Sequence, residues 1–339
     1  VLKTNLNETQ HQYLSIVNQS GNALLSIIND ILDFSKIEAG RLELDIEKCD
    51  LYEISAQATD IITYQIQNKG LEMLLNVATD LPRFVHTDSV RLKQILVNLL
   101  GNASKFTEKG EIELKIEILE SEGEFYKMRF AVRDTGIGIK PEKQAKIFEA
   151  FSQEDSSTTK KYGGTGLGLT ISNSLLRLMD SQLQLVSEPG KGSTFFFDVT
   201  LKTEEGDAID WFDVEKINNV LIVDDNENNR LIVRQMLLLK NIQSVEASNG
   251  FEALQALATG QKFDVILMDY HMPFMDGLET IRKIRETFDS WGSDEPIMLL
   301  HSSSDDHKII ENCKELRVHH RLIKPIKIQE FYQALSKLH

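Results

Sequence analysis

The sequence is poor in cysteine, has no long apolar run and has no excess of basic residues, and each absence excludes a class of protein. Its two cysteines, Cys49 and Cys313, lie far apart and lack the spacing of a metal site or disulfide, which favours a reducing compartment. No apolar run approaches the length of a membrane span, and no signal-peptide pattern is present. Acidic residues outnumber basic ones by 52 to 37, which argues against direct contact with nucleic acid.

Two widespread nucleotide-binding signatures are also missing. The sequence contains no GxxxxGK[ST] run, and its GTGLG run at residues 164–168 does not follow a strand, as a dinucleotide site would require. The length of 339 residues suits two domains and a helical appendage. Because the chain begins with Val1 rather than Met, we expect it to be a piece of a longer protein.

Residues 14–32 are predicted to form one long amphipathic helix. Their apolar residues recur at spacings of three and four, and they comprise Leu14, Val17, Gly21, Leu24, Leu25, Ile28, Ile31 and Leu32. A lone helix cannot bury such a stripe, so the pattern predicts a partner helix, in this chain or in another. Packing of the stripe on the chain's own globular domain is the alternative.

Residues 88–106 are predicted to form a helix that carries Asn98, Asn102 and Lys105 on one face. Two alternating strands follow, near residues 112–118 and 128–134. Asp134 continues the inward side of the second strand, where a carboxylate is costly unless hydrogen bonds are donated to it. Two further strands are expected at residues 182–186 and 194–201.

The stretch 134–172 has the features of a nucleotide pocket with a mobile lid. Asp134 can accept from the exocyclic amine of a purine, and Gly136 and Gly138 allow the ring to approach the backbone. Further glycines lead into a helix whose amino end favours phosphate, with nearby ammonium groups in support; these residues are Gly164, Gly166, Gly168, Lys160 and Lys161. Asn102 is a plausible magnesium ligand, assisted by Asn98. Taken singly, a glycine run of this kind is more often a plain loop.

Beyond an acidic linker, short apolar runs alternate with helical patterns five times, which predicts a parallel sheet with helices on both faces. Asp224, Asp225, Asp269 and Lys324 follow strands of this sheet and are expected to converge at its carboxyl edge. Three carboxylates would repel one another unless a divalent cation and an ammonium group lay among them. The pattern predicts phosphoryl transfer to Asp269. Magnesium would be bound by Asp225, and Asp224 would act through a bound water. Helix capping is the alternative for any one of these acids.

The first two thirds of the sequence resemble the sensor histidine kinases. The matching runs, in order, are NLLGNASKFT (98–107), DTGIGI (134–139), IFEAF (147–151), GGTGLGL (163–169) and PGKGSTF (189–195), preceded by DFSKIEAG (33–40). The resemblance implies an α/β sandwich shared with the heat-shock chaperone and gyrase ATPases, a bundle helix before it, and ATP and Mg²⁺ as cofactors. It assigns adenine to Asp134 and lid anchoring to Phe148 and Phe151. It assigns the binding of magnesium and the phosphates to Asn98, Asn102, Lys105, Phe106, Gly164, Thr165, Gly166, Leu167 and Gly168.

Residues 217–339 resemble a response-regulator receiver domain through NVLIVDDNENNR (219–230), MDYHMPFMDG (268–277) and LIKP (322–325). The resemblance implies a flavodoxin-like (βα)5 fold, Asp269 as phosphoacceptor with Lys324 as its partner, the carbonyl of His271 on the metal and a cis bond before Pro325. The family's hydroxyl after the fourth strand is assigned to Ser302, while alignment on the apolar run would place His301 there. Arg321 stands where the family has an aromatic switch residue.

Together the resemblances predict a partial dimerisation helix at residues 1–47, an ATP-binding domain at 48–203, a linker at 204–216 and a receiver at 217–339. No run like HEIRTP, which carries the phosphoaccepting histidine in the family, occurs here, and the context of His11 differs from it. We therefore expect this chain alone to lack autophosphorylation.

The expected partners are a second copy, a phosphoacceptor histidine domain, and a downstream response regulator or phosphotransfer protein. The expected location is cytoplasmic, as part of a membrane-anchored bacterial sensor. The alternative to a histidine kinase is a regulatory scaffold that binds ATP and carries a receiver.

Overall fold

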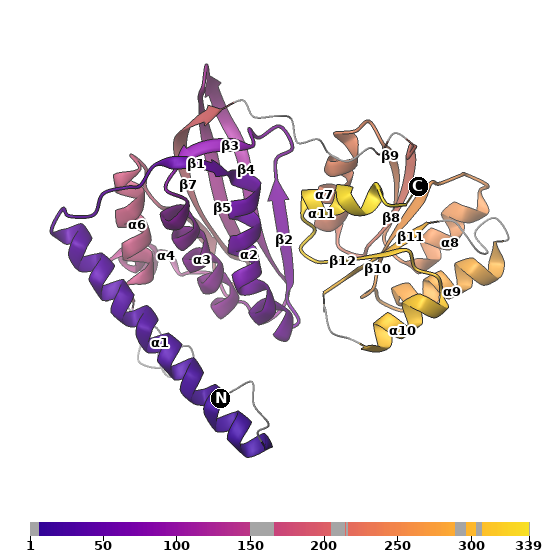
Figure 1. The fold of residues 1–339 in the computed structure, drawn as a ribbon, viewed down its shortest axis with the longest axis horizontal. Coiled ribbons are helices and arrows are strands. Elements are labelled where there is room, and N and C mark those ends of the chain that lie inside the picture. Colours follow the sequence, from indigo (N-terminus) through magenta and orange to yellow (C-terminus); the bar gives the residue numbers. More distant parts are fainter. Residues whose placement is uncertain are drawn as a thin grey trace.

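The computed structural model describes residues 7–149, 166–204, 214, 216–288, 296–302 and 307–338. Figure 1 shows a long first helix, a sheet covered by helices, and a second sheet with its own helices, in chain order. No helix within the described ranges combines the length and apolar character needed to cross a membrane.

The predicted amphipathic helix is present as α1, Glu8–Glu38. It begins with a capping box, because the Asn7 side chain accepts from the Gln10 amide at 2.9 Å and the Gln10 side chain accepts from the Asn7 amide at 3.1 Å. Its last turns are anchored, since Asp33 accepts from Arg91 at 2.9 Å. The rest of the helix projects away from the first sheet (Figure 1).

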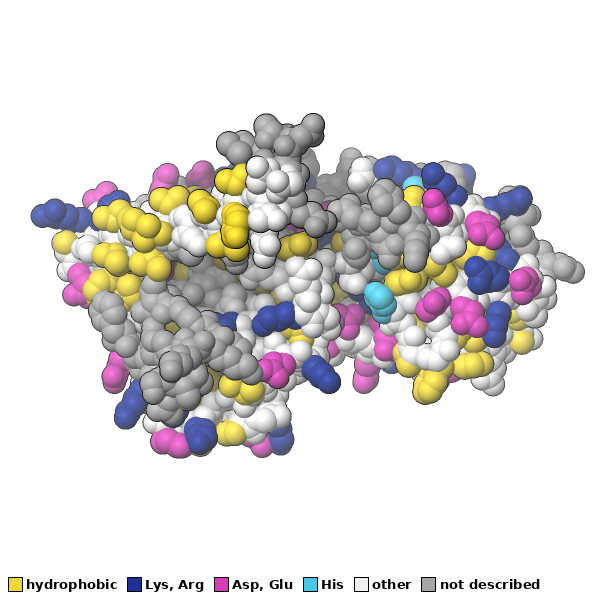
Figure 2. All heavy atoms as spheres, turned by 90° about the horizontal axis from the view of Figure 1, so that it is seen from below, with side chains coloured by type: hydrophobic (Ala, Val, Ile, Leu, Met, Phe, Trp, Pro, Cys, Tyr) yellow, Lys and Arg dark blue, Asp and Glu magenta, His cyan; other side chains and the backbone are white. Residues whose placement is uncertain are grey.

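The apolar stripe of α1 is exposed along the projecting part. Figure 2 shows apolar side chains gathered over this helix. The exposed members of the stripe are Val17, Leu24, Leu25, Ile28, Ile31 and Leu32. The alternative prediction, that the helix buries its stripe on its own domain, is therefore wrong for these residues.

The first sheet has seven strands, in the order β1-β3-β7-β5-β4-β2, with β6 paired to β7. The strands are β1 (Glu47–Asp50), β2 (Glu72–Val77), β3 (Phe84–Thr87), β4 (Glu111–Glu122), β5 (Phe125–Asp134), β6 (Gln184–Glu188) and β7 (Gly192–Glu204). Three helices pack on one face of this sheet: α2 (Leu51–Asn68), α3 (Ser89–Phe106) and α6 (Gly168–Leu178). This is the predicted α/β sandwich, called the sandwich domain below.

Alternation in the sequence explains the packing of the sandwich domain. In β5 every second residue from Met128 onward is buried, and Asp134 occupies the last buried position, as predicted. The predicted helix at 88–106 is α3, which begins after Asp88, whose side chain accepts from the Arg91 amide at 2.9 Å. Leu92, Ile95, Leu96, Leu99 and Leu100 of α3 are buried against the strands.

The second sheet is parallel, with five strands in the order β12-β11-β10-β8-β9. The strands are β8 (Asn219–Val223), β9 (Gln243–Ala247), β10 (Val265–Asp269), β11 (Ile297–His301) and β12 (His320–Ile323). The helices are α7 (Glu227–Leu238), α8 (Gly250–Ala258), α9 (Gly277–Thr287), α10 (His307–Glu315) and α11 (Ile328–Leu335). The predicted flavodoxin-like strand order and helices on both faces are confirmed.

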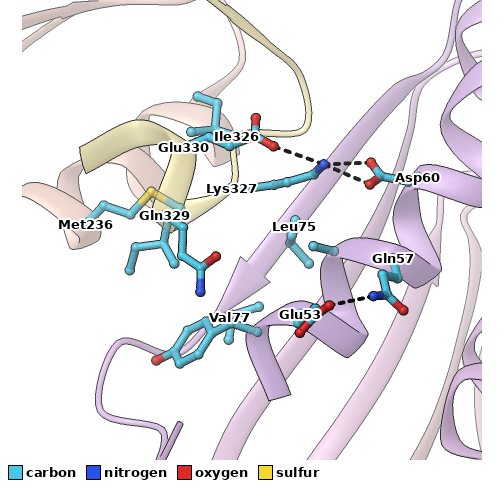
Figure 3. A pocket seen from close by; sticks show the side chains of 13 residues that line it. Glu53, Gln57, Asp60, Leu75, Val77, Met236, Ile326, Lys327, Gln329 and Glu330 are labelled. Atoms are coloured by element: carbon cyan, nitrogen blue, oxygen red, sulfur yellow. Dashed lines mark hydrogen bonds and ion pairs between the residues drawn. The ribbon is translucent and has the colours of Figure 1, made fainter. Parts of the chain in front are cut away.

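The two domains pack against each other through the edge strand β2 of the sandwich domain and through α7 and α11 of the second domain (Figure 1). Buried Met236, Phe331, Tyr332 and Leu335 belong to the same apolar cluster as the core of the sandwich domain. A cavity of about 210 Å³ remains at this junction, between Leu75 and Val77 on one side and Ile326 and Met236 on the other (Figure 3).

Candidate functional site

Asp134, at the end of β5, forms the floor of the predicted nucleotide pocket. Asp134 is buried, with 5% of its surface exposed, and its Oδ1 accepts from the Gly136 amide at 2.8 Å. Burial raises the pKa of Asp134, against hydrogen bonds from Gly136 and Ser193 and the charge of Arg133, which lower it. The structure thus holds a desolvated acceptor where the sequence predicted one.

Glycines surround Asp134 because backbone segments approach it too closely for a side chain. A Cβ on Gly136 would overlap the carbonyl oxygen of Phe106, and one on Gly192 would overlap the carbonyl oxygen of Asp134 itself. Gly192 also has a φ of +106°. Gly138, with a φ of +68°, lies against the carbonyl of Glu188. These three positions therefore require glycine for close packing of the backbone around Asp134.

The polar face of α3 meets the start of α6. Asn98 Nδ2 donates to Ser172 Oγ at 2.8 Å, and a Cβ on Gly168 would overlap Asn98 Oδ1. Asn102 lies one turn further along α3 and is half-buried. Lys105, near the end of α3, has its ammonium 5.0 Å from the ring centroid of Phe106. Partial burial lowers the pKa of Lys105.

The amino end of α6 has the properties of an anion site. The helix begins at Gly168 after Leu167, whose side chain makes no capping hydrogen bond, and Gly166 before it has a φ of +70°. The first amides of a helix have no partner within the helix, and the aligned peptide dipoles give that end a partial positive charge. The oxygen of Asn102 and these amides fit the donor and acceptor needs of a magnesium-bound triphosphate.

Both ends of the predicted lid lie within the described residues. Phe148, in the short helix η1 (Lys146–Phe148), packs against the core, and its carbonyl accepts from the Thr170 hydroxyl of α6 at 3.4 Å. Of the predicted pocket residues, Lys160, Lys161, Gly164 and Thr165 lie outside the described residues, as do the lid anchor Phe151 and residues 152–159.

The four receiver residues converge at the carboxyl edge of the parallel sheet, as predicted. One ligand atom from each of Asp224, Asp225 and Asp269 lies within 4.8 Å of the others. The ammonium of Lys324 lies 2.8 Å from Asp224 Oδ2 and 2.7 Å from Asp269 Oδ1. Three carboxylate oxygens gathered at this spacing fit a hard divalent cation such as Mg²⁺, which prefers oxygen ligands.

Burial sets the electrostatics of this cluster. It raises the pKa of Asp269, and the nearby carboxylates of Asp224 and Glu72 add to the rise, while Lys324 opposes it. Burial alone would lower the pKa of Lys324, but Asp224, Asp269 and Glu72 outweigh it and raise that pKa. Lys324 therefore stays charged beside Asp269.

The surrounding backbone agrees with the predicted receiver site. The bond between Lys324 and Pro325 is cis, which confirms that prediction. A Cβ on Gly277 would overlap the carbonyl of Asp269, so the start of α9 can lie against the end of β10 because residue 277 is glycine. His271 follows two residues after Asp269 with an exposed ring that meets the Tyr270 ring edge-on at 4.6 Å between centroids.

Both candidates for the hydroxyl position lie at the end of β11. His301 is buried, and its carbonyl accepts from the Lys324 amide at 2.9 Å. Ser302 follows it and is half-buried. Arg321 lies exposed on β12, where the family carries its aromatic switch residue.

The sequence did not predict a fourth carboxylate at this site. Glu72, the first residue of β2 in the sandwich domain, has an oxygen 3.1 Å from the Lys324 ammonium. Asn226 Nδ2 donates to Glu72 at 2.6 Å, and Asn229 donates to the other oxygen. Burial alone would raise the pKa of Glu72, yet Lys324 and the two asparagines lower it below its ordinary value. Glu72 is therefore an anion inside the receiver site.

Three family models match the chain. The histidine kinase-, DNA gyrase B- and HSP90-like ATPase matches residues 87–204, the response regulator receiver domain matches residues 220–336, and the His Kinase A phospho-acceptor domain matches residues 1–40. These matches lie within or overlap the segments that the sequence motifs assigned to an ATP-binding domain, a receiver and a dimerisation helix.

Relatives align over nearly the whole of this chain. The autoinducer 2 sensor kinase/phosphatase LuxQ of Vibrio cholerae serotype O1 is 32% identical over 98% of this chain and 39% of its own. Hybrid signal transduction histidine kinase K of Dictyostelium discoideum is 33% identical over 98% of this chain and 29% of its own. The chain thus spans less than half of the length of either relative.

The crystal structure of full-length ShkA in complex with AMPPNP has a similar fold, with a TM-score of 0.51 at 23% identity, covering 99% of this chain and 94% of that one. These comparisons do not favour the alternative of a regulatory scaffold. With the helix, the ATPase sandwich and the receiver all matched in order, the chain belongs to the hybrid histidine kinases.

Proposed function

We propose that this chain binds Mg²⁺ and ATP in the sandwich domain for phosphorylation of a histidine on a phosphoacceptor domain, and that the receiver accepts the phosphoryl group on Asp269. The observation that carries the proposal is the presence, in one chain, of a helix that starts at Gly168, of the buried acceptor Asp134 and of a lysine among three carboxylates.

In the sandwich domain, Asp134 accepts from the adenine amine while Gly136 and Gly138 let the ring lie against the backbone. The phosphates lie at the start of α6, and the described part of the phosphate site is formed by Gly166, Leu167, Gly168, Asn98, Asn102, Lys105 and Phe106. Lys160, Lys161, Gly164 and Thr165 complete this proposal from the sequence. The AMPPNP bound in the ShkA structure, which shares the fold, supports ATP as the nucleotide.

In the receiver, an Asp269 oxygen forms a bond to phosphorus as the phosphorus–nitrogen bond of the phosphohistidine breaks, and the histidine leaves with the electron pair of that bond on its nitrogen. Lys324 pairs with the phosphoryl oxygens, and Ser302 supplies the hydroxyl to one of them. Asp224, Asp225, Asp269 and the carbonyl of His271 would hold magnesium, which supplies positive charge against the phosphoryl oxygens.

The proposed partners follow from surfaces of the chain and from its family. The exposed stripe of α1 binds a second copy of the chain, because six exposed apolar side chains on one helix need a partner helix. A downstream response regulator or phosphotransfer protein receives the signal, and the chain lies on the cytoplasmic side of a membrane-anchored sensor. The domain limits are residues 1–47, 48–203, 204–216 and 217–339.

The receiver half of the proposal is tested by incubating the chain with acetyl phosphate and Mg²⁺ and locating the acyl phosphate by mass spectrometry. We expect label on Asp269 and none after Asp269→Asn. Asp276→Asn is the matched control, because Asp276 is exposed and its capping bond to the Glu279 amide, 2.8 Å long, suits asparagine equally well. Equal labelling of the Asp269→Asn variant would refute the assignment.

The nucleotide half is tested by thermal unfolding with Mg²⁺ and ATP. A ligand that binds the folded state alone raises the unfolding temperature by mass action. An unchanged unfolding temperature at millimolar ATP would contradict the pocket.

A further inference from the structure

The receiver site is closed on one side by the sandwich domain. Glu72, at the start of the edge strand β2, lies 3.1 Å from the Lys324 ammonium, which also lies 2.7 Å from the phosphoacceptor Asp269. The Glu72 side chain is 27% exposed. An anion from one domain thus occupies part of the reaction site of the other.

Glu72 is committed to the receiver. In the described part of the chain, its side chain contacts Lys324, Asn226 and Asn229, and all three belong to the receiver. Neighbouring Glu111 differs, because it also pairs with Arg133 of its own sheet while it accepts from Asn228 at 2.8 Å and from Asn226 at 2.7 Å. If the domains separated, Glu111 would keep Arg133 as a partner, whereas Glu72 would lose its three receiver partners.

A second set of contacts surrounds this one. Lys327 lies 2.8 Å from Asp60 on α2, and Gln67 donates to the carbonyl of Lys324 at 3.2 Å. Figure 3 shows Lys327 between Asp60 of the sandwich domain and Glu330 of the receiver, beside the cavity at the junction. The carbonyl and the ammonium of Lys324 are therefore both engaged by the sandwich domain.

We propose that Glu72 holds the receiver against the sandwich domain only while Asp269 is unphosphorylated, and that phosphorylation of Asp269 releases the receiver. This inference rests on the proposed function of Asp269. Transfer forms the bond between Asp269 and phosphorus as the donor's bond to phosphorus breaks, and the donor leaves with its electron pair.

The charge at Asp269 differs between the unphosphorylated and the phosphorylated receiver. The new group brings close to two negative charges and three acceptor oxygens to the ammonium that Glu72 already uses. Because Asp269 and Glu72 lie on the same ammonium, the phosphoryl oxygens compete with Glu72 for its protons and repel its carboxylate. The docked receiver is therefore a poor phosphoacceptor, and the phosphorylated receiver is a poor docking partner, since coupling between two equilibria is reciprocal.

The test uses the intact chain and compares Glu72→Ala and Glu72→Gln with Glu120→Ala. Glu120 lies near the far end of β4, and its surface pair with Lys127 is 3.4 Å long, so its removal changes the charge equally without touching the receiver. Two quantities are measured: the initial rate of Asp269 labelling by acetyl phosphate with Mg²⁺, and backbone hydrogen exchange in residues 72–77 and 227–238.

We expect both Glu72 variants to label about tenfold faster or more, the factor that corresponds to losing a hydrogen bond to a charged group. We also expect exchange in the two segments of the unmodified chain to rise with beryllofluoride, a stable stand-in for the phosphoryl group, to the level that Glu72→Ala shows without it. The isosteric Glu72→Gln variant keeps the side-chain volume, so it reports on charge if the alanine variant folds poorly.

Equal labelling rates in the Glu72 variants and the unmodified chain would overturn the inference while leaving Asp269 as the phosphoacceptor. Unchanged exchange in residues 72–77 after full modification of Asp269 would overturn it too. Failure of every variant to label at Asp269 would instead refute the proposed function, and the inference would fall with it.

Discussion

Replacing Asp134 by asparagine tests how the nucleotide pocket reads adenine. The aspartate has two acceptor oxygens, of which Oδ1 already accepts from the Gly136 amide at 2.8 Å. Asparagine has one oxygen and one NH₂ group, so it cannot accept from the Gly136 and Ser193 amides and from the adenine amine without presenting a donor to one of them. The variant keeps the volume of the side chain and loses one charge-assisted hydrogen bond to the ligand.

The loss can be put on an energy scale. A hydrogen bond to a charged group contributes ~1.5–3 kcal/mol, so the affinity for ATP falls by ~10–150-fold. At an ATP concentration of ~100 times the parent dissociation constant, ligand stabilisation of the parent is ~2.7 kcal/mol and that of the variant is ~0.3–1.4 kcal/mol. For a domain of this size, each kcal/mol moves the unfolding temperature by ~2–4 °C.

Without ATP, the substitution is not expected to lower the unfolding temperature. Burial raises the pKa of Asp134, so the folded protein binds this proton more tightly than the unfolded chain. The ionised carboxylate therefore costs stability at neutral pH, and this cost disappears as the pH falls below the ordinary range of aspartate. Ligand-free Asp134→Asn should unfold at the same or a higher temperature than the parent at pH 7, and the difference should narrow towards acid pH.

The assay is thermal unfolding of the intact chain with Mg²⁺, with and without ATP, following the sandwich-domain transition. Asp180→Asn is the matched control, since Asp180 is exposed and its φ of 55° suits asparagine. A full ATP-dependent shift in Asp134→Asn would refute the assigned role. A lower unfolding temperature of the ligand-free variant at pH 7 would refute the electrostatic reasoning.

Three further predictions concern other parts of the chain. Gly192→Ala should lower the free energy of unfolding of the sandwich domain, measured in urea, by about 3 kcal/mol or more, because its Cβ would overlap the Asp134 carbonyl. The control is Gly190→Ala, whose Cβ would meet open space and which should cost ~1–2 kcal/mol for its positive φ alone. Lys324→Met should destabilise the receiver by ~3–5 kcal/mol at neutral pH by leaving buried carboxylates unpaired, and Mg²⁺ should raise its unfolding temperature more than that of the parent. Leu24→Glu should convert a dimer into a monomer in light scattering, while Ile61→Glu, on α2 and equally apolar and exposed, should not; a monomeric parent would contradict the dimer.

Periodicity and strand-end chemistry made much of both sites predictable. Asp134 was found from the inward parity of Met128, Phe130 and Val132, and the meeting of Asp224, Asp269 and Lys324 follows from their positions after parallel strands. Such inferences need only the local period and one topological rule, so they hold without knowledge of distant contacts.

Glu72 could not be found in this way. The run LEMLLNV at residues 71–77 carries one acidic residue at the start of an ordinary apolar strand, and nothing local distinguishes it from Glu111 or Glu113. Its role depends on how the edge of one sheet meets the helices of another domain, 252 residues away in sequence from Lys324. The order of the seven-stranded sheet was unpredicted for the same reason, since it pairs strands far apart in the chain.

The position of β2 has a consequence for solubility. Among the described strands it pairs with β4 on one side only, so its other edge carries backbone groups that the ladder does not satisfy, and α7 of the receiver lies beside it. An uncovered sheet edge is a template for pairing with another chain. The receiver covers this edge of the sandwich domain. Release of the receiver, as proposed above, would therefore expose a strand able to pair with another chain.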